Sequence, residues 1–399
     1  MSIQERSLEL FADDKVDMRV LKERAVGMRW GSVPEGTIPL TSADPDFKPA
    51  PEISKAIIEY LKGGYFPYAS NTGSMRLRET LAQGLRDRKG ESIPPAYILP
   101  IDSAAAVLDA IAAAVLEPGD EAIIFDPVDL LFGIAIRRAK GKVVYFPSVH
   151  NENGWVLDNL DDYVTDKTRM ICLCNPHNPM GYLYSTEELR AIAEFADRHG
   201  LWIMNDEIWS DIVFSEKAFI SINSLGPELN RRTISCYGYS KGFGLAGLRA
   251  AFAYTLNEQA YQKIAAAATG HVYGVDVLTQ VAMEAAFENC FYWVDAFVAH
   301  LQRNRDYIYE RFAAMPLIKA TKQEATFVTF PDIRATGLTS TEFVAKMREE
   351  QKVALVPGTE FWFGPRAEGY VRLCYSTSRA ILTEALDRIE AGLVRIANV

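Results

Sequence analysis

The sequence has no long apolar run and no surplus of positive charge. Its 399 residues contain no apolar stretch near the roughly 20 residues that a membrane-spanning helix needs, so no membrane partner is expected. Lys and Arg number 42 against 52 Asp and Glu, and the formal net charge of −10 argues against nucleic-acid binding, which needs a basic surface. Residues 1–6 lack the basic and apolar regions of a signal peptide, so we predict a cytoplasmic protein.

Cysteine and histidine are also scarce, with five of each. The cysteines, at 172, 174, 236, 290 and 374, form an odd and scattered set, which predicts no disulfide framework and a reducing compartment. Cys172 and Cys174 lie two residues apart and could pair at a metal, but packing in a core explains them better. The histidines have no zinc-like spacing, and we predict no metal site.

Apolar residues, by contrast, make up 49% of the chain, which is enough for a sizeable core and more than one domain. Short apolar runs alternate with helical patterns, which predicts an α/β fold with a mostly parallel sheet covered by helices on both faces. The expected strands are 122–125, 143–146, 169–173, 201–204, 233–239 and 250–254, and the expected helices are 52–61, 103–116, 186–198 and 278–288.

The last part of the chain has a different pattern. A long predicted helix, 292–314, leads away from the sheet, and 326–330 and 370–374 are the expected strands of a smaller α+β part. The N-terminal residues are expected to return and join it. The sequence therefore predicts an N-terminal segment, 1–50, that joins the small domain, a large ligand-binding domain, 51–290, and a small α+β domain, 291–399.

One lysine follows a predicted strand inside a glycine-rich segment. Lys241 is followed by Gly242, Gly244 and Gly247, and Arg249 comes eight residues after the lysine. The glycines let the backbone approach a ligand closely. A lysine among apolar neighbours can lose its proton and form a Schiff base with a carbonyl, and an arginine can hold a phosphate with two hydrogen bonds. These two capacities together predict pyridoxal 5′-phosphate, although a solvated loop lysine is the simpler alternative.

Two motifs upstream of the lysine also follow predicted strands. Asn178 lies in the run Cys-Asn-Pro-His-Asn-Pro-Met-Gly at 174–181, and Asp206 lies in Asn-Asp-Glu-Ile-Trp-Ser-Asp at 205–211. Ligands of open α/β sheets bind beyond the carboxyl ends of the strands. We therefore expect the asparagine, the acid and Lys241 to meet in one crevice.

This ordered set of motifs resembles that of fold type I pyridoxal-phosphate-dependent enzymes of the class I/II aminotransferase superfamily. The resemblance extends from about Ile38 to the C-terminal helix. It implies a mostly parallel seven-stranded sheet sandwiched by helices, in a large cofactor-binding domain, and a smaller α+β domain. It also implies an enzyme that moves the amino group of a free α-amino acid to a 2-oxo acid.

The resemblance implies a role for each motif residue. Lys241 forms the Schiff base with the cofactor and moves protons at the substrate Cα, Asp206 pairs with the protonated pyridine nitrogen, and Asn178 hydrogen-bonds the phenolic oxygen. Arg249 binds the phosphate. Arg372, in Gly-Tyr-Val-Arg-Leu, grips the α-carboxylate of the substrate.

Two further phosphate contacts are predicted. Ser103, a good helix N-cap, opens the alanine-rich stretch with Ala104 and Ala105, and the first amides of a helix favour an anion. An ordinary buried helix with a serine cap is the alternative. Tyr68 matches a tyrosine that reaches the phosphate of the neighbouring subunit, which implies a homodimer with shared active sites. The segment 270–276 is expected near the pocket of the partner.

Three positions depart from the family pattern. Gly238 stands where a serine or threonine usually touches the phosphate; Ser240 is the candidate substitute, and a serine at 238 is expected to tighten cofactor binding. Trp209 stands where aminotransferases usually carry tyrosine, and its indole can pack on the cofactor but has no acceptor. For the aromatic ring that stacks on the cofactor, Asp129 and Phe132 occupy the two candidate places.

A second function stays open. Residues 43–47, Ala-Asp-Pro-Asp-Phe, resemble the Ala-Asp-x-Asp-Phe signature of cystathionine-lyase-like proteins, and Ala43 is expected at the substrate with Asn178 and Arg372. Residues 244–249 are more aminotransferase-like. The resemblance therefore favours an aminotransferase. The alternatives are a carbon–sulfur β-lyase, or another eliminating or decarboxylating enzyme, and a catalytically silent binding protein on the same scaffold.

Overall fold

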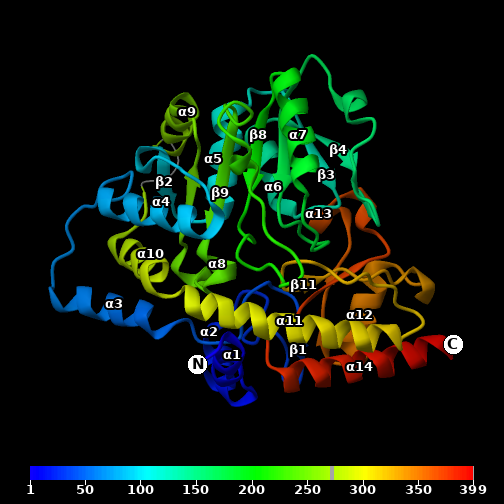
Figure 1. The fold of residues 1–399 in the computed structure, drawn as a ribbon. Coiled ribbons are helices and arrows are strands. Elements are labelled where there is room, and N and C mark those ends of the chain that lie inside the picture. Colours follow the sequence, from blue (N-terminus) through cyan, green and yellow to red (C-terminus); the bar gives the residue numbers. More distant parts are fainter. Residues whose placement is uncertain (270–273, 399) are drawn as a thin grey trace.

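The computed structural model describes residues 1–269 and 274–398, and a seven-stranded sheet lies at its centre (Figure 1). Four pairings in this sheet are parallel, and β10 is antiparallel to both of its neighbours. This confirms the expected α/β fold with a seven-stranded, mostly parallel sheet. In spatial order the strands are β2 (Ile98–Ile101), β10 (Ala251–Tyr254), β9 (Thr233–Gly238), β8 (Trp202–Asp206), β7 (Thr168–Cys174), β3 (Glu121–Asp126) and β4 (Lys142–Pro147).

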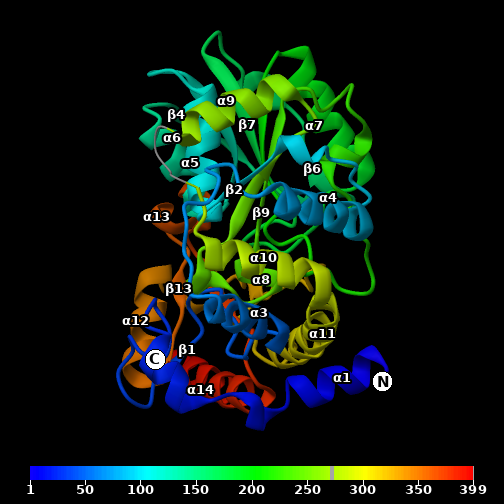
Figure 2. The same ribbon diagram turned by 90° about the vertical axis from the view of Figure 1, so that its left-hand side faces the viewer.

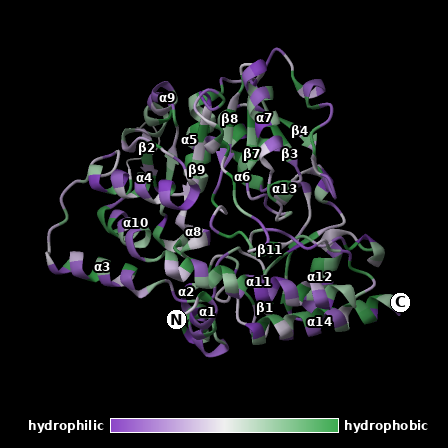
Figure 3. Cartoon of the chain, in the orientation of Figure 1, coloured by the Kyte–Doolittle hydropathy of each residue, from purple (hydrophilic) through white to green (hydrophobic). Residues whose placement is uncertain are grey.

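Helices cover both faces of the sheet, because its central strands are apolar on both sides (Figure 1). One face packs on α5 (Ala104–Val115), α6 (Leu130–Arg138) and α9 (Glu258–Thr269), and the other packs on α7 (Thr186–Arg198). Figure 3 shows apolar segments gathered in the sheet and polar ones on the outer helices. The remaining elements of this part are α3 (Pro51–Lys62), α4 (Met75–Lys89), β5 (Val149–Asn151), β6 (Gly154–Val156), α8 (Tyr239–Gly242) and α10 (Val277–Asn289).

The 23-residue helix α11 (Phe291–Ala313) leads from this sheet to a second, smaller α+β part (Figure 2). Its antiparallel sheet has the order β11-β14-β13. The predicted strand 326–330 is shorter in the structure because Thr326 has φ +71°, which an extended strand cannot continue. The elements are β11 (Val328–Thr329), α12 (Ser340–Glu350), β12 (Val353–Ala354), β13 (Val356–Pro357), α13 (Glu360–Phe363), β14 (Val371–Cys374) and α14 (Arg379–Ala397).

The N-terminal segment lies against the smaller part. Helix α1 (Ile3–Leu10) packs along α11, and β1 (Ile38–Pro39) pairs in parallel with β12 (Figure 2). Between them lies α2 (Met18–Arg24). The boundaries of the three predicted parts, at residues 50 and 290, stay a prediction. No helix within residues 1–269 and 274–398 is both long and apolar enough to cross a membrane.

Candidate active site

A cavity of about 310 Å³ opens beyond the carboxyl ends of β7, β8 and β9. Its other walls come from the N-terminal segment, the start of α5, the start of α6, α13 and β14, so segments far apart in the sequence meet there. The lining residues are Met28, Ser42, Ala43, Ser103, Ala104, Ala105, Asp129, Leu131, Cys174, Asn178, Asp206, Ile208, Trp209, Ser240, Lys241, Leu245, Ala246, Arg249, Ala250, Trp362 and Arg372.

Lys241 projects into this cavity from the short helix α8, which begins directly after β9. Its Nζ donates a hydrogen bond to the carbonyl oxygen of Ala43 at 2.6 Å and lies 5.2 Å from the centre of the Trp209 ring. Burial lowers the pKa of Lys241; the nearby Asp44 carboxylate opposes this effect and the Arg372 guanidinium adds to it. A larger fraction of the amine is therefore neutral, as a nucleophile or a base requires.

Asp206 ends β8 and turns its carboxyl toward the same cavity. Burial raises the pKa of Asp206 to about 7, although its Oδ1 accepts a hydrogen bond from the Ile208 N–H at 2.9 Å. A buried carboxylate with so little compensation favours a cation as its partner.

Three polar side chains form a chain on the side of the cavity next to β14. Asn178 Nδ2 donates to Asp129 Oδ2 at 2.8 Å, and Arg372 Nη1 donates to Asn178 Oδ1 at 3.5 Å. Arg372 Nη2 also donates to the carbonyl oxygen of Thr41 at 3.3 Å, whereas its buried Nε has no partner within the described residues. The second hydrogen of the Asn178 amide and the second hydrogens of the two Arg372 Nη atoms are not used by these bonds and can be donated to a ligand.

The end of the cavity at the start of α5 is suited to an anion. The Ser103 hydroxyl caps α5 by accepting a hydrogen bond from the Ala106 N–H at 3.2 Å, and Ala104 and Ala105 line the cavity with the first turn of that helix. Ser240 and Arg249 line the same cavity. A helix N-terminus, a hydroxyl and a guanidinium together form a typical phosphate-binding set.

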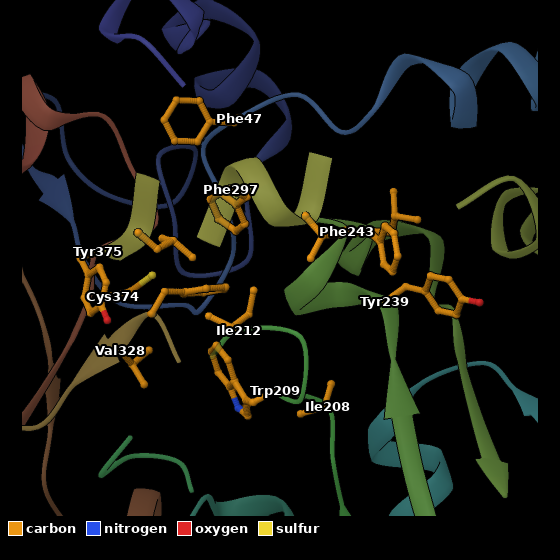
Figure 4. Close-up of a cluster of buried hydrophobic side chains, with 14 of the residues drawn as sticks. Phe47, Ile208, Trp209, Ile212, Tyr239, Phe243, Phe297, Val328, Cys374 and Tyr375 are labelled. Atoms are coloured by element: carbon orange, nitrogen blue, oxygen red, sulfur yellow. The ribbon is translucent and has the colours of Figure 1, made fainter. Parts of the chain in front are cut away.

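Trp209 packs deep in the molecule on the loop after β8 (Figure 4). Its indole meets Phe327 edge to face with ring centres 4.7 Å apart. Ile208, beside it, lies against Gly238: a Cβ atom at Gly238 would be 3.0 Å from Ile208 Cδ1. The loop that follows Asp206 is thus held by apolar packing at Ile208 and Trp209.

Two of the predicted site residues, Phe132 and Tyr68, do not line this cavity. Phe132 is buried in the core under α6, and Asp129 and Leu131 line the cavity in its place. Tyr68 is fully exposed and lines a separate hollow with residues 274–276. The remainder of the predicted segment, 270–273, lies outside the described residues.

Several lining residues were missed by the sequence interpretation. Met28, Ser42 and Trp362 reach the cavity from the N-terminal segment and from α13. Met28 and Trp362 come from segments that carry none of the motifs, whereas Ser42 directly precedes the run at 43–47, which could have pointed to it.

The matches with known proteins agree with this geometry. The sequence pattern of the family described as aminotransferase class I and II matches residues 35–389. The chain belongs to this family. An aromatic-amino-acid aminotransferase of Thermococcus litoralis is 32% identical over 90% of this chain and 92% of its own length. The cystathionine beta-lyase PatB of Bacillus subtilis is 28% identical over 89% of this chain and 92% of its own.

A solved structure allows the fold of this aminotransferase family member to be compared as well. A PLP-bound protein from Clostridium difficile 630 superposes with a TM-score of 0.87 at 26% identity, over 96% of this chain and 99% of the other. The chain is therefore an enzyme of the family with the fold that its motifs imply.

Proposed function

We propose that this protein is an aminotransferase that uses pyridoxal 5′-phosphate to move the amino group of a free α-amino acid to a 2-oxo acid. The observation that carries the proposal is the meeting of Lys241, Asp206 and Arg372 in one cavity with an anion-suited end. The family match and the PLP-bound relative support the same cofactor.

The residues present fit this cofactor by their chemistry. The anion-suited end offers the α5 N-terminus, Ser240 and Arg249 to a phosphate, and the buried Asp206 carboxyl offers a partner to a protonated ring nitrogen. When bound, the cofactor supplies an electron sink for the bond that breaks at the substrate Cα. Asp206 keeps the ring nitrogen protonated, which preserves that capacity.

The chain's own residues would bind the substrate and move its proton. Arg372 holds the α-carboxylate with the unused hydrogens of its Nη atoms, and this contact decides which Cα bond is oriented for cleavage. Lys241, with its lowered pKa, takes the Cα proton as a general base and returns a proton as a general acid. Trp209 packs beside the Lys241 amine and offers no proton acceptor.

A carbon–sulfur β-lyase is the second candidate. PatB, a cystathionine beta-lyase, is 28% identical, and residues 43–47 carry the lyase-like run. Ala43, the first residue of that run, accepts the hydrogen bond of the Lys241 amine. The two functions would differ in which bond of the substrate breaks.

Product analysis decides between the candidates. The loaded protein is incubated with each of the twenty amino acids and with cysteine conjugates, with and without a 2-oxo acid. We expect a new amino acid and a new 2-oxo acid. Pyruvate, ammonia and a thiol would instead identify a lyase. An unchanged spectrum with every compound would contradict both and leave a silent binding protein.

We further propose a cytoplasmic homodimer that shares its two active sites. The exposed Tyr68 and the exposed apolar side chains near it in the sequence, Ile58, Leu61, Tyr65, Phe66 and Met75, favour a covering partner. We also keep the division into an N-terminal segment, a large domain and a small domain, with the second boundary at the start of α11.

A further inference from the structure

Asp129 places a carboxylate inside the cavity beside Arg372. Its Oδ1 accepts a hydrogen bond from the Leu131 N–H at 3.1 Å and so caps α6. Its Oδ2 accepts from Asn178 Nδ2 at 2.8 Å and lies 3.8 Å from Arg372 Nη1. Only 18% of the Asp129 side chain is exposed, so its charge is weakly screened by solvent.

The charges around Arg372 do not balance when the ligands of the proposed function are bound. Among the described lining residues, the cationic side chains are Lys241, Arg249 and Arg372, and the anionic ones are Asp129 and Asp206. Under the proposed function Arg249 faces the phosphate, Asp206 faces the ring nitrogen, and Lys241 carries the cofactor. Arg372 then stands between two carboxylates, that of the substrate and that of Asp129. Because these two carboxylates share one guanidinium, the negative charge beside Arg372 is only partly compensated.

We propose that Asp129 is a specificity-determining residue that selects amino acids with a cationic side chain, an ammonium or a guanidinium, over those with a second carboxylate. The inference rests on the proposed function. A cationic end group supplies the missing charge, whereas a distal carboxylate adds another uncompensated charge near Asp129. Met28, Leu131 and Trp362 line the same cavity and offer apolar surface to the methylene groups of a long side chain.

The capping role of Asp129 has to be separated from its charge. Asparagine is as good an N-cap and keeps an oxygen acceptor for Asn178, so Asp129→Asn removes the charge with little structural change. Asp129→Ser, another good cap, serves if the first variant does not fold. Asp17→Asn is the matched control, because Asp17 caps α2 by accepting from the Val20 N–H at 3.2 Å and does not line the cavity.

Three amino acids of similar length isolate the charge: lysine, norleucine and 2-aminoadipate. Rates of amino-group transfer by the loaded protein are measured for each, and calorimetry without a 2-oxo acid measures their binding to the same loaded protein. We expect the parent to prefer lysine to 2-aminoadipate. We expect Asp129→Asn to lower that preference by about tenfold or more, while Asp17→Asn leaves it unchanged.

An unchanged lysine-to-aminoadipate preference in Asp129→Asn, in both rates and binding, overturns the inference. A binding preference that shifts as expected, in a protein that transfers no amino group, supports the inference and contradicts the proposed function. If the loaded protein transfers the amino group of norleucine but Asp129→Asn has an unchanged lysine-to-aminoadipate preference, the proposed function stands and the role proposed for Asp129 is wrong.

Discussion

The δ1 methyl group of Ile208 occupies the space beside Gly238, where a Cβ atom would lie only 3.0 Å from it. Ala104, at the start of α5, lies 3.6 Å from the same point. Ile208 therefore occupies the space that a serine side chain at position 238 would need to reach the anion-suited end of the cavity. The missing hydroxyl at 238 and the isoleucine at 208 are two parts of one packing arrangement.

This contact makes the expected effect of Gly238→Ser depend on Ile208. A hydroxyl that reaches a phosphate adds a hydrogen bond worth about 0.5–1.5 kcal/mol, or more with a charged partner, which is up to about tenfold in affinity. We expect the gain to be larger in Gly238→Ser combined with Ile208→Val, which removes the nearest methyl group. Cofactor dissociation constants are compared for the double variant and for each single variant. No gain in the double variant would mean that Ser240 or Ser103 already fills the role.

Replacement of Lys241 tests the covalent link. We expect Lys241→Ala to lose the yellow absorbance that borohydride traps and to lose at least about 10²–10⁴-fold in activity, the range for removal of a general acid–base. Lys346→Ala, on the exposed side of α12, is the control and should keep both properties. A reduced label that peptide mapping finds on another lysine would contradict the assignment.

Trp209 is expected to influence the reaction outcome. We expect Trp209→Tyr to raise transamination relative to any elimination, because a phenol offers the hydroxyl that the indole lacks. The smaller ring also loses contact with Phe327, which should cost about 1–3 kcal/mol of stability. Product ratios and thermal unfolding measure the two effects separately. Equal ratios of transamination to elimination products in parent and variant would show that Trp209 does not influence which reaction occurs.

Asp206 predicts a pH dependence of stability in the cofactor-free protein. Its pKa is raised from an ordinary 3.8 to about 7, so the folded protein holds this proton more tightly than the unfolded chain. The free energy of unfolding should therefore fall as pH rises from about 4 to 7, by about 4 kcal/mol at 1.36 kcal/mol per pKa unit. Asp206→Asn should flatten this fall, as measured by urea unfolding at pH 4 to 8. Asp197→Asn, at an exposed position of α7, should leave it intact.

The proposed dimer predicts a role for Tyr68 that its own subunit cannot explain, since the side chain is fully exposed in the single chain. We expect Tyr68→Phe to weaken cofactor binding by about tenfold through loss of one hydrogen bond to a charged group. Tyr65→Phe, three residues earlier and also exposed, is the matched control. Sedimentation should find a dimer in all three proteins; an active monomer would refute the shared site.

Much of the site could be predicted because its motifs sit where strands end. Asn178, Asp206 and Lys241 each follow an apolar run, and parallel strands bring their carboxyl ends to one edge of the sheet. The predicted strand 233–239 ended one residue late, because Tyr239 already begins α8. That shift places Lys241 on a helical turn and does not move it from the cavity.

The sequence by itself determined the α/β alternation and the motif residues, because hydrophobic periodicity and the residue types at strand ends are local properties of the chain. The seven-stranded sheet followed from the family resemblance that those motifs carry, since the residue pattern alone predicted six of its strands and not β2. Only the tertiary structure placed Asp129 at the cavity and Phe132 in the core. Asp129 caps α6 and faces the cavity, whereas Phe132 turns with the helix into the core. The approach of Ile208 to Gly238, and of Met28 and Trp362 to the cavity, likewise depends on packing between segments far apart in sequence, which no local pattern encodes.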